Sequence, residues 1–299
     1  MKRYNIATTA GDNLYYVPMY VMLLSLYENN KDIAFNIFVL HKTIDKSAKN
    51  QADILASKYN STISWIKVEN PEIDTYYTSV YITGAAYYRI FLAELLPSDI
   101  NEVLYLDSDI IIRGSIKELL ETNMEGMPLA AVKEAIPYKI ERLGINTPYD
   151  YFNAGVLLID LLKWRERGYV HTLTTNIKKH HSHYIMHDQD ALNDVFHDKI
   201  LFLSPIWNQQ TAFYHLTPKE LNERYNYKDV NLINNAVIIH FTTQYKPWQY
   251  DNTHPYKPLF LKYLSETPFS DFAQKPTMSL WISKIIKRVK HKLRKILSR

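Results

Sequence analysis

The sequence has no cysteine and only 7 glycines among its 299 residues. Without cysteine the chain has no disulfide framework, which suits a protein of a reducing compartment. Neither of the glycine-rich fingerprints that cradle phosphate groups is present. A nucleotide bound by this chain would therefore be held through a metal ion and individual side chains.

Long apolar runs are also missing. The longest, residues 15–27, is interrupted by Pro18 and Ser25 and is too short to span a bilayer as a helix. The N-terminal segment, MKRYNIATTAGDN, has two basic residues without the apolar stretch of a secretory signal. Hydrophobic residues make up 46% of the chain, which is the usage of a globular protein with a sizeable core. We therefore expect a soluble, cytoplasmic body.

Acidic residues are absent from the C-terminal segment 279–299, which carries eight Lys and Arg residues. The whole chain has a net charge of +4. Because eight of its positive charges lie in this segment, residues 1–278 have a net charge of −4. The body lacks the basic footprint of a nucleic-acid-binding protein, and we expect no nucleic-acid partner.

The same C-terminal segment has an apolar stripe at helical spacing, opposite its cations. The stripe begins at Trp281 and continues through Ile282, Ile285, Ile286, Val289, Leu293, Ile296 and Leu297. Such a basic amphipathic helix is typical of a segment that lies on an anionic membrane surface. The alternative is a helix that docks on the body or on an acidic partner.

Strand and helix patterns alternate along the body. Apolar, β-prone runs predict strands over residues 5–10, 36–41, 63–68, 103–106, 128–133, 153–161, 201–203 and 236–242. Helical patterns predict helices over 15–27, 46–59, 85–96, 162–179 and 189–196, with Asp45 and Asp188 as N-caps. This alternation predicts an open, mostly parallel α/β sheet, in which ligands bind at the carboxyl ends of the strands.

Two carboxylates interrupt apolar sequence at Asp107-Ser108-Asp109, between the runs VLYL and III. Carboxylates in such surroundings are costly unless they are paired or bind a cation. Asp107 and Asp109 both lie on one side of an extended segment, where both can reach a hard divalent ion that bridges a diphosphate. The alternative is that they only turn the chain at a strand end.

His240 also follows a buried run, Val237-Ile238-Ile239. Two carboxylates and an imidazole form a ligand set that suits Mn²⁺ and leaves positions for phosphate oxygens. Lys246 follows six residues later and could neutralise a diphosphate. A histidine that hydrogen-bonds in the core and a solvated loop lysine are the alternatives.

Four polar residues elsewhere suggest a sugar site. Asn153 opens an apolar run, and Asp188 and Gln189 begin a helix, where they could either cap an element or hold sugar hydroxyls. Arg89 lies in an apolar helical segment, where a buried guanidinium needs an anion from the protein or the substrate.

These residues together resemble glycosyltransferase family 8, the retaining bacterial galactosyl- and glucosyltransferases of lipo-oligosaccharide and glycoprotein assembly. The matching segments keep the family's order over residues 4–250. They are AGDN (10–13), Arg89, LYLDSD (104–109), YFNAGVLLIDL (151–161), DQDALN (188–193) and HFTTQYKPW (240–248). The basic tail also looks like that of membrane-associated members. The resemblance implies a single GT-A (Rossmann-like) domain over residues 1–255, an extension over 256–278 and the amphipathic helix over 279–299.

The resemblance also implies roles for individual residues. Mn²⁺ would be bound by Asp107, Asp109 and His240. The nucleotide of a UDP-hexose would be held by Thr9, Ala10, Asp12, Asn13 and Lys246, and its sugar by Arg89, Asn153, Asp188 and Gln189. The predicted donor site also includes Gly11, Ser108 and Thr243. Gly11 departs from the family pattern, because many members have there an acid that contacts uracil, and Thr243 replaces the usual glycine near the diphosphate.

The expected reaction is transfer of galactose or glucose from UDP to a glycan acceptor, on a lipid-linked oligosaccharide or a glycoprotein, with retention. Retention has two routes, a covalent intermediate on Gln189 or Asp188, or same-face attack guided by the leaving phosphate. We expect peripheral association with the inner face of the plasma membrane. The alternatives are a non-catalytic, membrane-bound protein that binds nucleotide sugars and, less favoured, a metal-dependent phosphatase.

Overall fold

The computed structural model describes residues 2–11, 13–78, 83–145, 147, 150–180, 183–225, 234–275, 277–278 and 280. The chain divides into two units, Met1–Thr242 and Thr243–Arg299. The predicted amphipathic helix lies almost wholly outside the described residues, as does Asp12. The predicted boundaries at residues 255 and 278 stay predictions.

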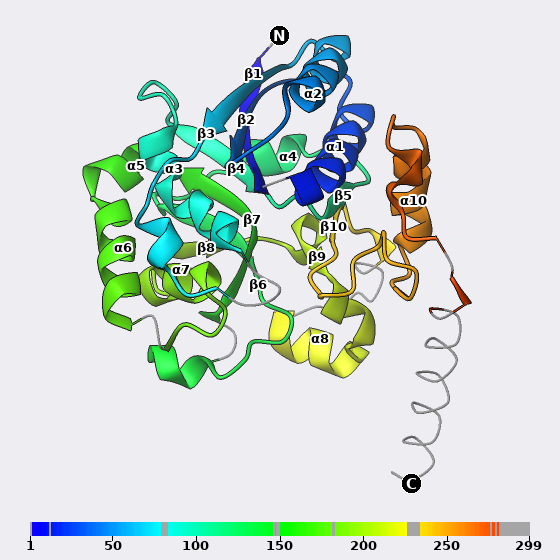
Figure 1. The fold of residues 1–299 in the computed structure, drawn as a ribbon. Helices are drawn as coiled ribbons and strands as arrows, with labels where there is room; N and C mark the ends of the chain where they lie inside the picture. Colours follow the sequence, from blue (N-terminus) through cyan, green and yellow to red (C-terminus); the bar gives the residue numbers. More distant parts are fainter. Residues whose placement is uncertain are drawn as a thin grey trace, which may run out of the picture. The chain divides into compact units, whose positions relative to one another are not determined.

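A seven-stranded sheet with the order β3-β2-β1-β4-β7-β6-β8 forms the centre of the first unit (Figure 1). Its neighbours pair in parallel except at β7, which runs antiparallel to both β4 and β6. The strands are β1 (Arg3–Gly11), β2 (Ala34–His41), β3 (Thr62–Lys67), β4 (Glu102–Leu106), β6 (Leu129–Lys133), β7 (Phe152–Asp160) and β8 (Ile200–Phe202). The predicted mostly parallel α/β sheet is confirmed.

A second sheet of three strands, in the order β5-β10-β9, contains β5 (Ile110–Ile112), β9 (Gln209–Gln210) and β10 (Ile238–His240). The strand predicted over 236–242 is therefore shorter, and it does not join the main sheet. Because β5 follows Asp109 directly and pairs with β10 so that Ile110 lies opposite His240, the small sheet brings His240 to the end of β4.

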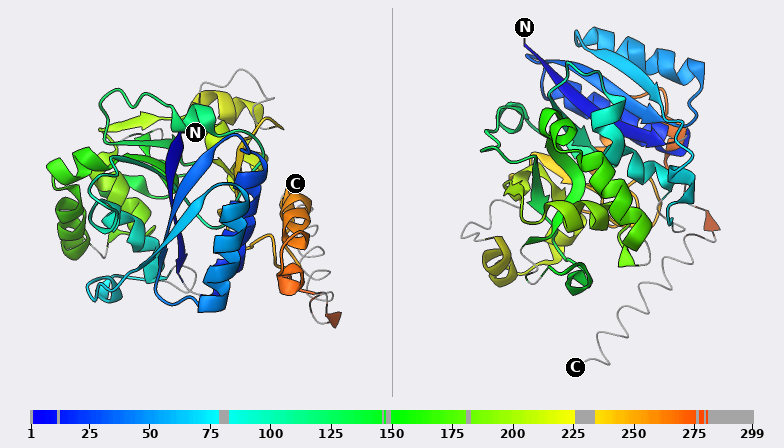
Figure 2. Two further views of the ribbon diagram at one scale, coloured as in Figure 1. Left: turned by 90° about the horizontal axis from the view of Figure 1, so that it is seen from above. Right: turned by 90° about the vertical axis from the view of Figure 1, so that its left-hand side faces the viewer.

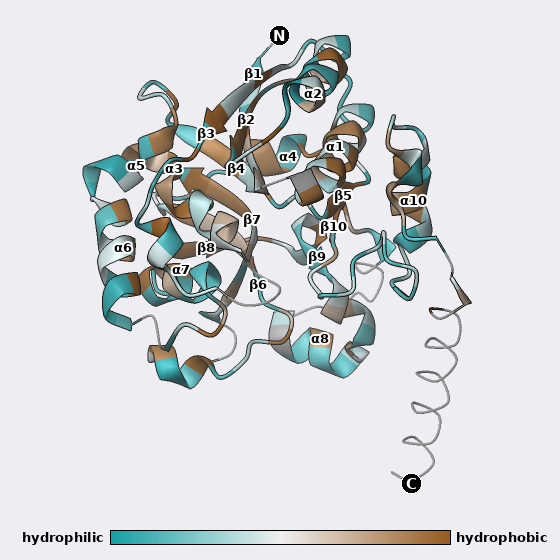
Figure 3. Ribbon diagram, viewed as in Figure 1, coloured by the Kyte–Doolittle hydropathy of each residue, from teal (hydrophilic) through white to brown (hydrophobic). Residues whose placement is uncertain are grey.

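Helices cover both faces of the main sheet (Figure 2). One face is covered by the helices α1 (Asn13–Glu28) and α2 (Lys46–Lys58). The other is covered by η2 (Gly84–Phe91), α3 (Leu92–Leu95), α5 (Leu161–Glu166), α6 (Tyr169–His180) and α7 (Asp188–Phe196). Alternate strand residues such as Ala7 and Tyr105 pack into this second layer in one large buried cluster, as period-two alternation requires. Figure 3 shows the hydrophobic colour concentrated in the central strands.

Three helices differ from their predictions. Residues 84–91 form a 3₁₀ helix that continues into the short α3, instead of one α-helix over 85–96. The helix predicted over 162–179 is two helices, separated at Gly168, whose φ of 63° lies in the left-handed region that favours glycine. Asp188 is the first residue of α7 rather than its N-cap, which is His187.

The remaining short elements are mostly single turns. They are η1 (Ile73–Thr75), α4 (Lys117–Leu120), η3 (Ile140–Leu143), η6 (Pro205–Trp207), η7 (Thr211–His215) and α8 (Pro218–Tyr225).

The second unit is built around α10 (Lys257–Ser265) and the 3₁₀ turn η8 (Ser270–Phe272). Trp248 packs against Phe260 and Phe272, with ring centroids 5.6 and 5.9 Å away. Nowhere in the described parts of the chain is a helix both long and apolar enough to cross a membrane.

The topology explains why predicted site residues meet at one edge of the main sheet. β1, β4 and β6 run in the same direction, so the residues after them, including Asp107 and Glu134, lie at their common carboxyl edge. β7 runs in the opposite direction, so its beginning at Asn153 lies at that same edge. The observed topology agrees with the general placement of ligand sites in open α/β sheets.

Candidate functional site

Asp107 and Asp109 occupy the link between the two sheets. The backbone N–H of Asp107 donates to Gly155 O at 2.8 Å, and its side chain accepts a hydrogen bond from the Tyr105 hydroxyl at 2.9 Å. Asp109 O accepts from the N–H of Phe241 at 3.0 Å, beside β10. These contacts fix the carboxylates between β4, β7 and β10.

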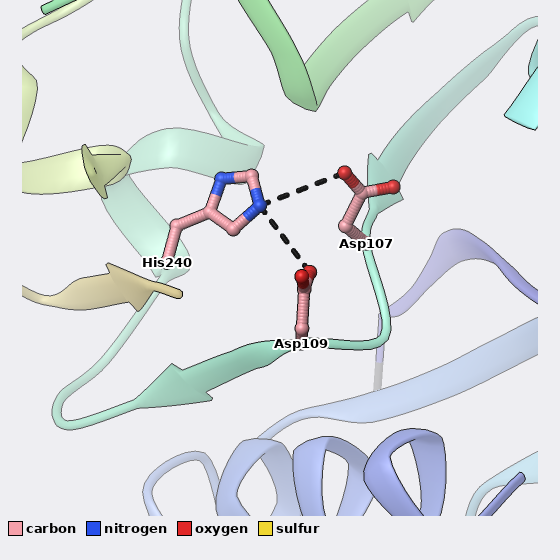
Figure 4. Close-up of side chains that lie close together, drawn as sticks. All are labelled: Asp107, Asp109 and His240. Carbon is pink, nitrogen blue, oxygen red and sulfur yellow. Dashed lines mark ion pairs between the residues drawn. The ribbon is translucent and has the colours of Figure 1, made fainter. Parts of the chain in front are cut away.

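His240 completes a group of three metal-ligand side chains (Figure 4). Its Nε2 lies 3.6 Å from Asp107 Oδ2 and 3.3 Å from Asp109 Oδ1. Two ligands at right angles, each about 2.2 Å from one ion, lie about 3.1 Å apart. Among the described residues, this is the one group of three or more acidic, His or Cys side chains that could hold a metal ion. The predicted set Asp107, Asp109 and His240 is thus brought together.

Hydrogen bonds determine which nitrogen of His240 faces the carboxylates. Asn153 Oδ1 accepts from the backbone N–H of Gly155 at 3.0 Å, so the Asn208 group 2.9 Å from that oxygen is its NH₂. Asn208 Oδ1 therefore faces His240 Nδ1, 2.9 Å away, and accepts its proton. His240 thus turns its Nε2 toward the two carboxylates. A divalent metal ion between them could be bound by this nitrogen and both carboxylates together.

Gly155 leaves the space that the metal-ligand side chains occupy. A Cβ at this position would lie 2.1 Å from His240 Cε1 and 2.8 Å from Asp107 Oδ2. Neither side chain can yield without leaving the group, so only glycine is compatible with this arrangement.

Arg89 links the metal-ligand group to the predicted sugar residues. Its guanidinium lies 3.0 Å from Asp107 Oδ1 and 3.0 Å from Asp188 Oδ2, and it stacks over the Tyr105 ring at 4.5 Å. Burial by itself lowers the pKa of Arg89, but Asp107, Tyr105 and Asp188 together outweigh it, so the pKa is raised and the group stays charged. The anion that the buried arginine requires is thus supplied by two carboxylates of the protein.

Asp188 is a buried carboxylate with an unused acceptor. Burial raises its pKa to about 6, although Arg89 opposes the shift. The contact from Arg89 Nε is an ion pair by distance only, because Nε donates its hydrogen bond to Ala86 O at 3.1 Å. Asp188 Oδ2 accordingly has no hydrogen-bond donor among the described residues, and it could accept one from a sugar hydroxyl.

The Gln189 side chain is held by four neighbours. Its Oε1 accepts from the N–H of Ala154 at 3.0 Å and from Asn153 Nδ2 at 3.2 Å. Its Nε2 donates to Glu134 Oε2 at 3.2 Å and to the Tyr151 hydroxyl at 3.3 Å. Because Ala154 N–H can only donate and a carboxylate can only accept, the amide orientation is fixed. Both lone-pair directions of the amide oxygen are in use.

The predicted nucleotide residues lie at the end of β1. Ala10 is buried, and Gly11 adopts a φ of +60°, with Ala85 Cβ 3.0 Å from where a Cβ would stand. Ser108 donates to Thr9 O, and the Thr9 hydroxyl donates to the Tyr105 hydroxyl at 3.3 Å, because the one hydrogen of that phenol is already donated to Asp107. Ser108 and Thr9 thus join β4 to β1.

Four predicted nucleotide or diphosphate residues cannot be placed relative to this site. Asp12 lies outside the described residues, as does the side chain of Asn13. Thr243 and Lys246 belong to the second unit, where Thr243 Oγ1 donates to Tyr245 O at 3.2 Å and the Lys246 N–H donates to Gln249 Oε1 at 2.9 Å. Their roles stay predictions.

Asp188-Gln189-Asp190 repeats the acid spacing of Asp107-Ser108-Asp109, but it forms no second metal-ligand group with the described residues. Asp190 is fully buried and accepts from the Tyr151 hydroxyl at 2.6 Å and the N–H of Met186 at 2.6 Å. It also forms an ion pair with Arg142. These bonds occupy Asp190 in the protein interior.

The sequence interpretation missed Glu134 and Asn208. Glu134 follows the buried strand β6 directly, which is the same signal that identified Asp107, and its carboxylate binds Asn153 and Gln189. Asn208 lies between a three-residue 3₁₀ turn and a two-residue strand, which leave no periodic signal in the sequence.

Comparisons with known proteins identify one family. The family model described as glycosyl transferase family 8 matches residues 6–252. General stress protein A of Bacillus subtilis is 28% identical over 89% of this chain and 94% of its own length. Lipopolysaccharide 1,2-glucosyltransferase of Escherichia coli is 25% identical over 91% of this chain and 80% of its own length.

Among solved structures, galactosyltransferase LgtC in complex with donor and acceptor sugar analogues shares the fold. Its TM-score is 0.77 at 23% identity, over 94% of this chain and 99% of that chain. The fold expected from the sequence, GT-A, is therefore confirmed. The family match covers most of the chain and includes every residue of the metal-ligand group. The chain belongs to glycosyl transferase family 8, and it is a glycosyltransferase.

Proposed function

We propose that the protein transfers a hexose, galactose or glucose, from a UDP-sugar to a hydroxyl group of a glycan acceptor, with retention. The observation that carries the proposal is the group of Asp107, Asp109 and His240 beside two buried polar side chains, Asp188 and Gln189. Hard oxygen ligands and one imidazole suit Mn²⁺, and the adjacent polar side chains suit a sugar.

The residues present fit a divalent ion. Asp107, Asp109 and His240 would hold Mn²⁺, which when bound supplies Lewis-acid stabilisation to the leaving diphosphate. Asn208 orients the His240 imidazole, and Arg89 holds Asp107 in place through their ion pair. Lys246 of the second unit would add positive charge at the diphosphate.

The donor sugar would lie against Asp188, Gln189, Asn153 and Arg89. Asp188 Oδ2 is the acceptor that still needs a donor, so it would take a hydroxyl hydrogen of the hexose. The Gln189 amide, fixed by Glu134, would present a rigid surface to the sugar rather than a mobile one. Rigid placement of a substrate is itself a large part of catalysis.

The geometry favours same-face attack over a covalent intermediate. A nucleophilic Gln189 Oε1 would have to give up hydrogen bonds from Ala154 N–H and Asn153 Nδ2 in a buried environment. Asp188 is paired with Arg89, which fixes its carboxylate. In the same-face route the leaving phosphate takes the proton of the acceptor hydroxyl, and no protein side chain bonds to the sugar.

The acceptor class and the cell location are proposed from the tail and from relatives. Named relatives act on lipopolysaccharide, so we infer a glycan acceptor on a lipid-linked oligosaccharide or a glycoprotein. Segment 279–299 would bind the anionic inner face of the plasma membrane through its cations and apolar stripe. The protein would then work from the cytoplasm at that surface.

Release of UDP tests the proposal. The purified protein is incubated with Mn²⁺ and UDP-galactose, UDP-glucose or their N-acetyl forms, each with and without EDTA. We expect slow release from one hexose donor that EDTA abolishes. With an acceptor glycoside added, NMR of the transferred sugar should show the donor's anomeric configuration. Tight binding of a UDP-hexose without release to water or to any acceptor would instead support the non-catalytic binding protein.

A further inference from the structure

Tyr77 is an exposed aromatic side chain beside the sugar residues. Its ring is stacked on the ring of His187, with centroids 5.2 Å apart and planes 22° apart. Tyr77 is 54% exposed and His187 is 2% exposed, so the tyrosine is the outer ring of the pair. Asp188 and Gln189 follow His187 directly in the chain.

We propose that the Tyr77 ring is the stacking platform for a sugar ring of the acceptor, an assignment that rests on the proposed function. Pyranose rings have an apolar face of C–H groups, which packs on the flat face of an aromatic ring. The acceptor must approach the hexose held at Asp188 and Gln189. The ring of Tyr77 is open to solvent, and its support is the residue that precedes them.

The backbone of Tyr77 is anchored in the core, which makes the platform rigid. Its carbonyl accepts a hydrogen bond from the Tyr87 hydroxyl at 2.9 Å, and Tyr87 itself is buried. The same carbonyl lies 3.2 Å from His187 Nδ1, and a carbonyl can only accept, so the imidazole donates. A ring held in this way loses little conformational freedom when a ligand packs on it.

The backbone of His187 gives a second, independent observation. Its φ of 54° and ψ of −122° lie in a region that glycine prefers, and a histidine there is strained. Such strain persists where surrounding contacts over-determine the conformation, and it concentrates at ligand sites. Here it places the imidazole under Tyr77 while the chain turns into Asp188 and Gln189.

A scattered surface tyrosine is the alternative, since single exposed aromatic residues are common. Tyr138 is such a residue and serves as a matched control. It is 52% exposed, it lies on a different segment, and its ring contacts Lys139 rather than a ring beside the sugar residues. The inference assigns acceptor stacking to Tyr77 and none to Tyr138.

The test measures how the donor partitions between water and acceptor. The full chain with Mn²⁺ and its UDP-hexose is given methyl β-glucoside, methyl β-galactoside or methyl N-acetyl-β-glucosaminide, and hydrolysis and transfer are both quantified. For Tyr77→Ala, we expect the ratio of transfer to hydrolysis to fall about tenfold, because an aromatic contact is lost. Tyr77→Phe should keep the wild-type ratio, and so should Tyr138→Ala. An unchanged ratio in Tyr77→Ala, or an equal fall in Tyr138→Ala, overturns the inference.

Saturation-transfer NMR on the same glycosides, with Mg²⁺ and UDP in place of Mn²⁺ and donor, decides the contact without turnover. Ring C–H protons of at least one glycoside should receive saturation from wild type and from Tyr77→Phe, but not from Tyr77→Ala. If none of the three glycosides receives saturation from wild type, the inference is overturned. If no donor releases UDP, the proposed function fails, and this measurement still decides whether a sugar packs on Tyr77.

Discussion

At the scale of single residues, the metal-ligand group depends on side chains that are not metal ligands themselves. His240 turns Nε2 toward the carboxylates because its Nδ1–H donates a hydrogen bond to Asn208 Oδ1. The Asn208 amide is itself oriented by Asn153. Arg89 holds Asp107 from the other side through an ion pair at 3.0 Å. Outer residues of this kind determine both the tautomer and the orientation of metal ligands.

Replacing Asn208 tests this dependence. Asn208→Ala removes the acceptor for His240 Nδ1, so the imidazole is free to rotate or change tautomer. We expect the dissociation constant for Mn²⁺ to rise about 10–100-fold, with much of the activity restored at high Mn²⁺. Asn176→Ala is the control, because Asn176 also donates a side-chain hydrogen bond, to Asp194 at 3.0 Å, outside the metal-ligand group. Equal Mn²⁺ affinity in both variants would contradict the assigned role.

The raised pKa of Asp188 predicts a pH dependence of stability in the metal-free protein. Burial raises this pKa from 3.8 to about 6, so the folded state binds the proton more tightly than the unfolded state. The resulting stabilisation is present below pH 4 and is lost as the pH rises through 6. Asp188→Asn removes this titration, so its free energy of unfolding should gain about 2 kcal/mol on wild type between pH 4 and pH 7.

Urea unfolding of wild type and Asp188→Asn at several pH values measures this difference. The attraction of Arg89 for ionised Asp188 is already included in the shifted pKa. Any other effect of the new amide gives an offset that is nearly the same at each pH, so the change with pH is the informative quantity. A difference that does not vary between pH 4 and pH 7 would show that the Asp188 pKa is ordinary.

At the scale of elements, the reversed strand β7 builds much of the site. It places Asn153 and Gly155 at the carboxyl edge of β4, and Gly155 O holds the N–H of Asp107. The three-residue strand β5 carries the chain from Asp109 to its pairing with His240. A site made from one reversed strand and one short sheet depends on close backbone approach.

Gly155→Ala tests that approach. The new Cβ would overlap His240 Cε1, so we expect Mn²⁺ binding and UDP release to fall at least a hundredfold, because the overlap cannot be relieved without moving a ligand. Gly114→Ala is the matched control, since its Cβ would meet only Val237 Cγ1 at an ordinary 3.6 Å. Calorimetric titration of both variants with Mn²⁺ tests whether glycine is required at position 155. A Gly155→Ala protein that binds Mn²⁺ with wild-type affinity would show that it is not required.

The sequence predicts an element when the residues of that element alone carry its pattern. Apolar strands that end in carboxylates or His240 are visible as abrupt changes of residue type, and these gave the sheet and the metal-ligand group. Partner and direction of a strand depend on contacts far along the chain, so the antiparallel β7 and the separate small sheet had no local signal. The 3₁₀ form of η2 likewise carries the pattern of an α-helix.

At the scale of the whole molecule, the charge distribution separates a mildly acidic body from a basic tail. Residues 279–299 hold eight cations and no acid, although all but residue 280 lie outside the described residues. The first unit contains the complete metal-ligand group and the sugar residues. We therefore expect the tail to contribute to location rather than chemistry.

Deletion of segment 279–299 tests this separation. The shortened protein should no longer sediment with vesicles that contain anionic lipid, because the cations and the apolar stripe are both lost, and it should keep its UDP-hexose turnover in solution. The full-length protein should bind these vesicles more weakly as salt is raised. Unchanged vesicle binding after the deletion would rule out the membrane role.

The central claim is that Asp107, Asp109 and His240 together bind one divalent ion on which the donor depends. Electron paramagnetic resonance of free Mn²⁺, titrated against the protein with UDP present, measures this directly. The account predicts one bound Mn²⁺ per chain in wild type and a dissociation constant at least tenfold higher in Asp109→Asn. The control Asp198→Asn should bind Mn²⁺ as wild type does, because the Asp198 carboxylate is exposed and paired with Lys199. Wild-type affinity in Asp109→Asn would contradict it.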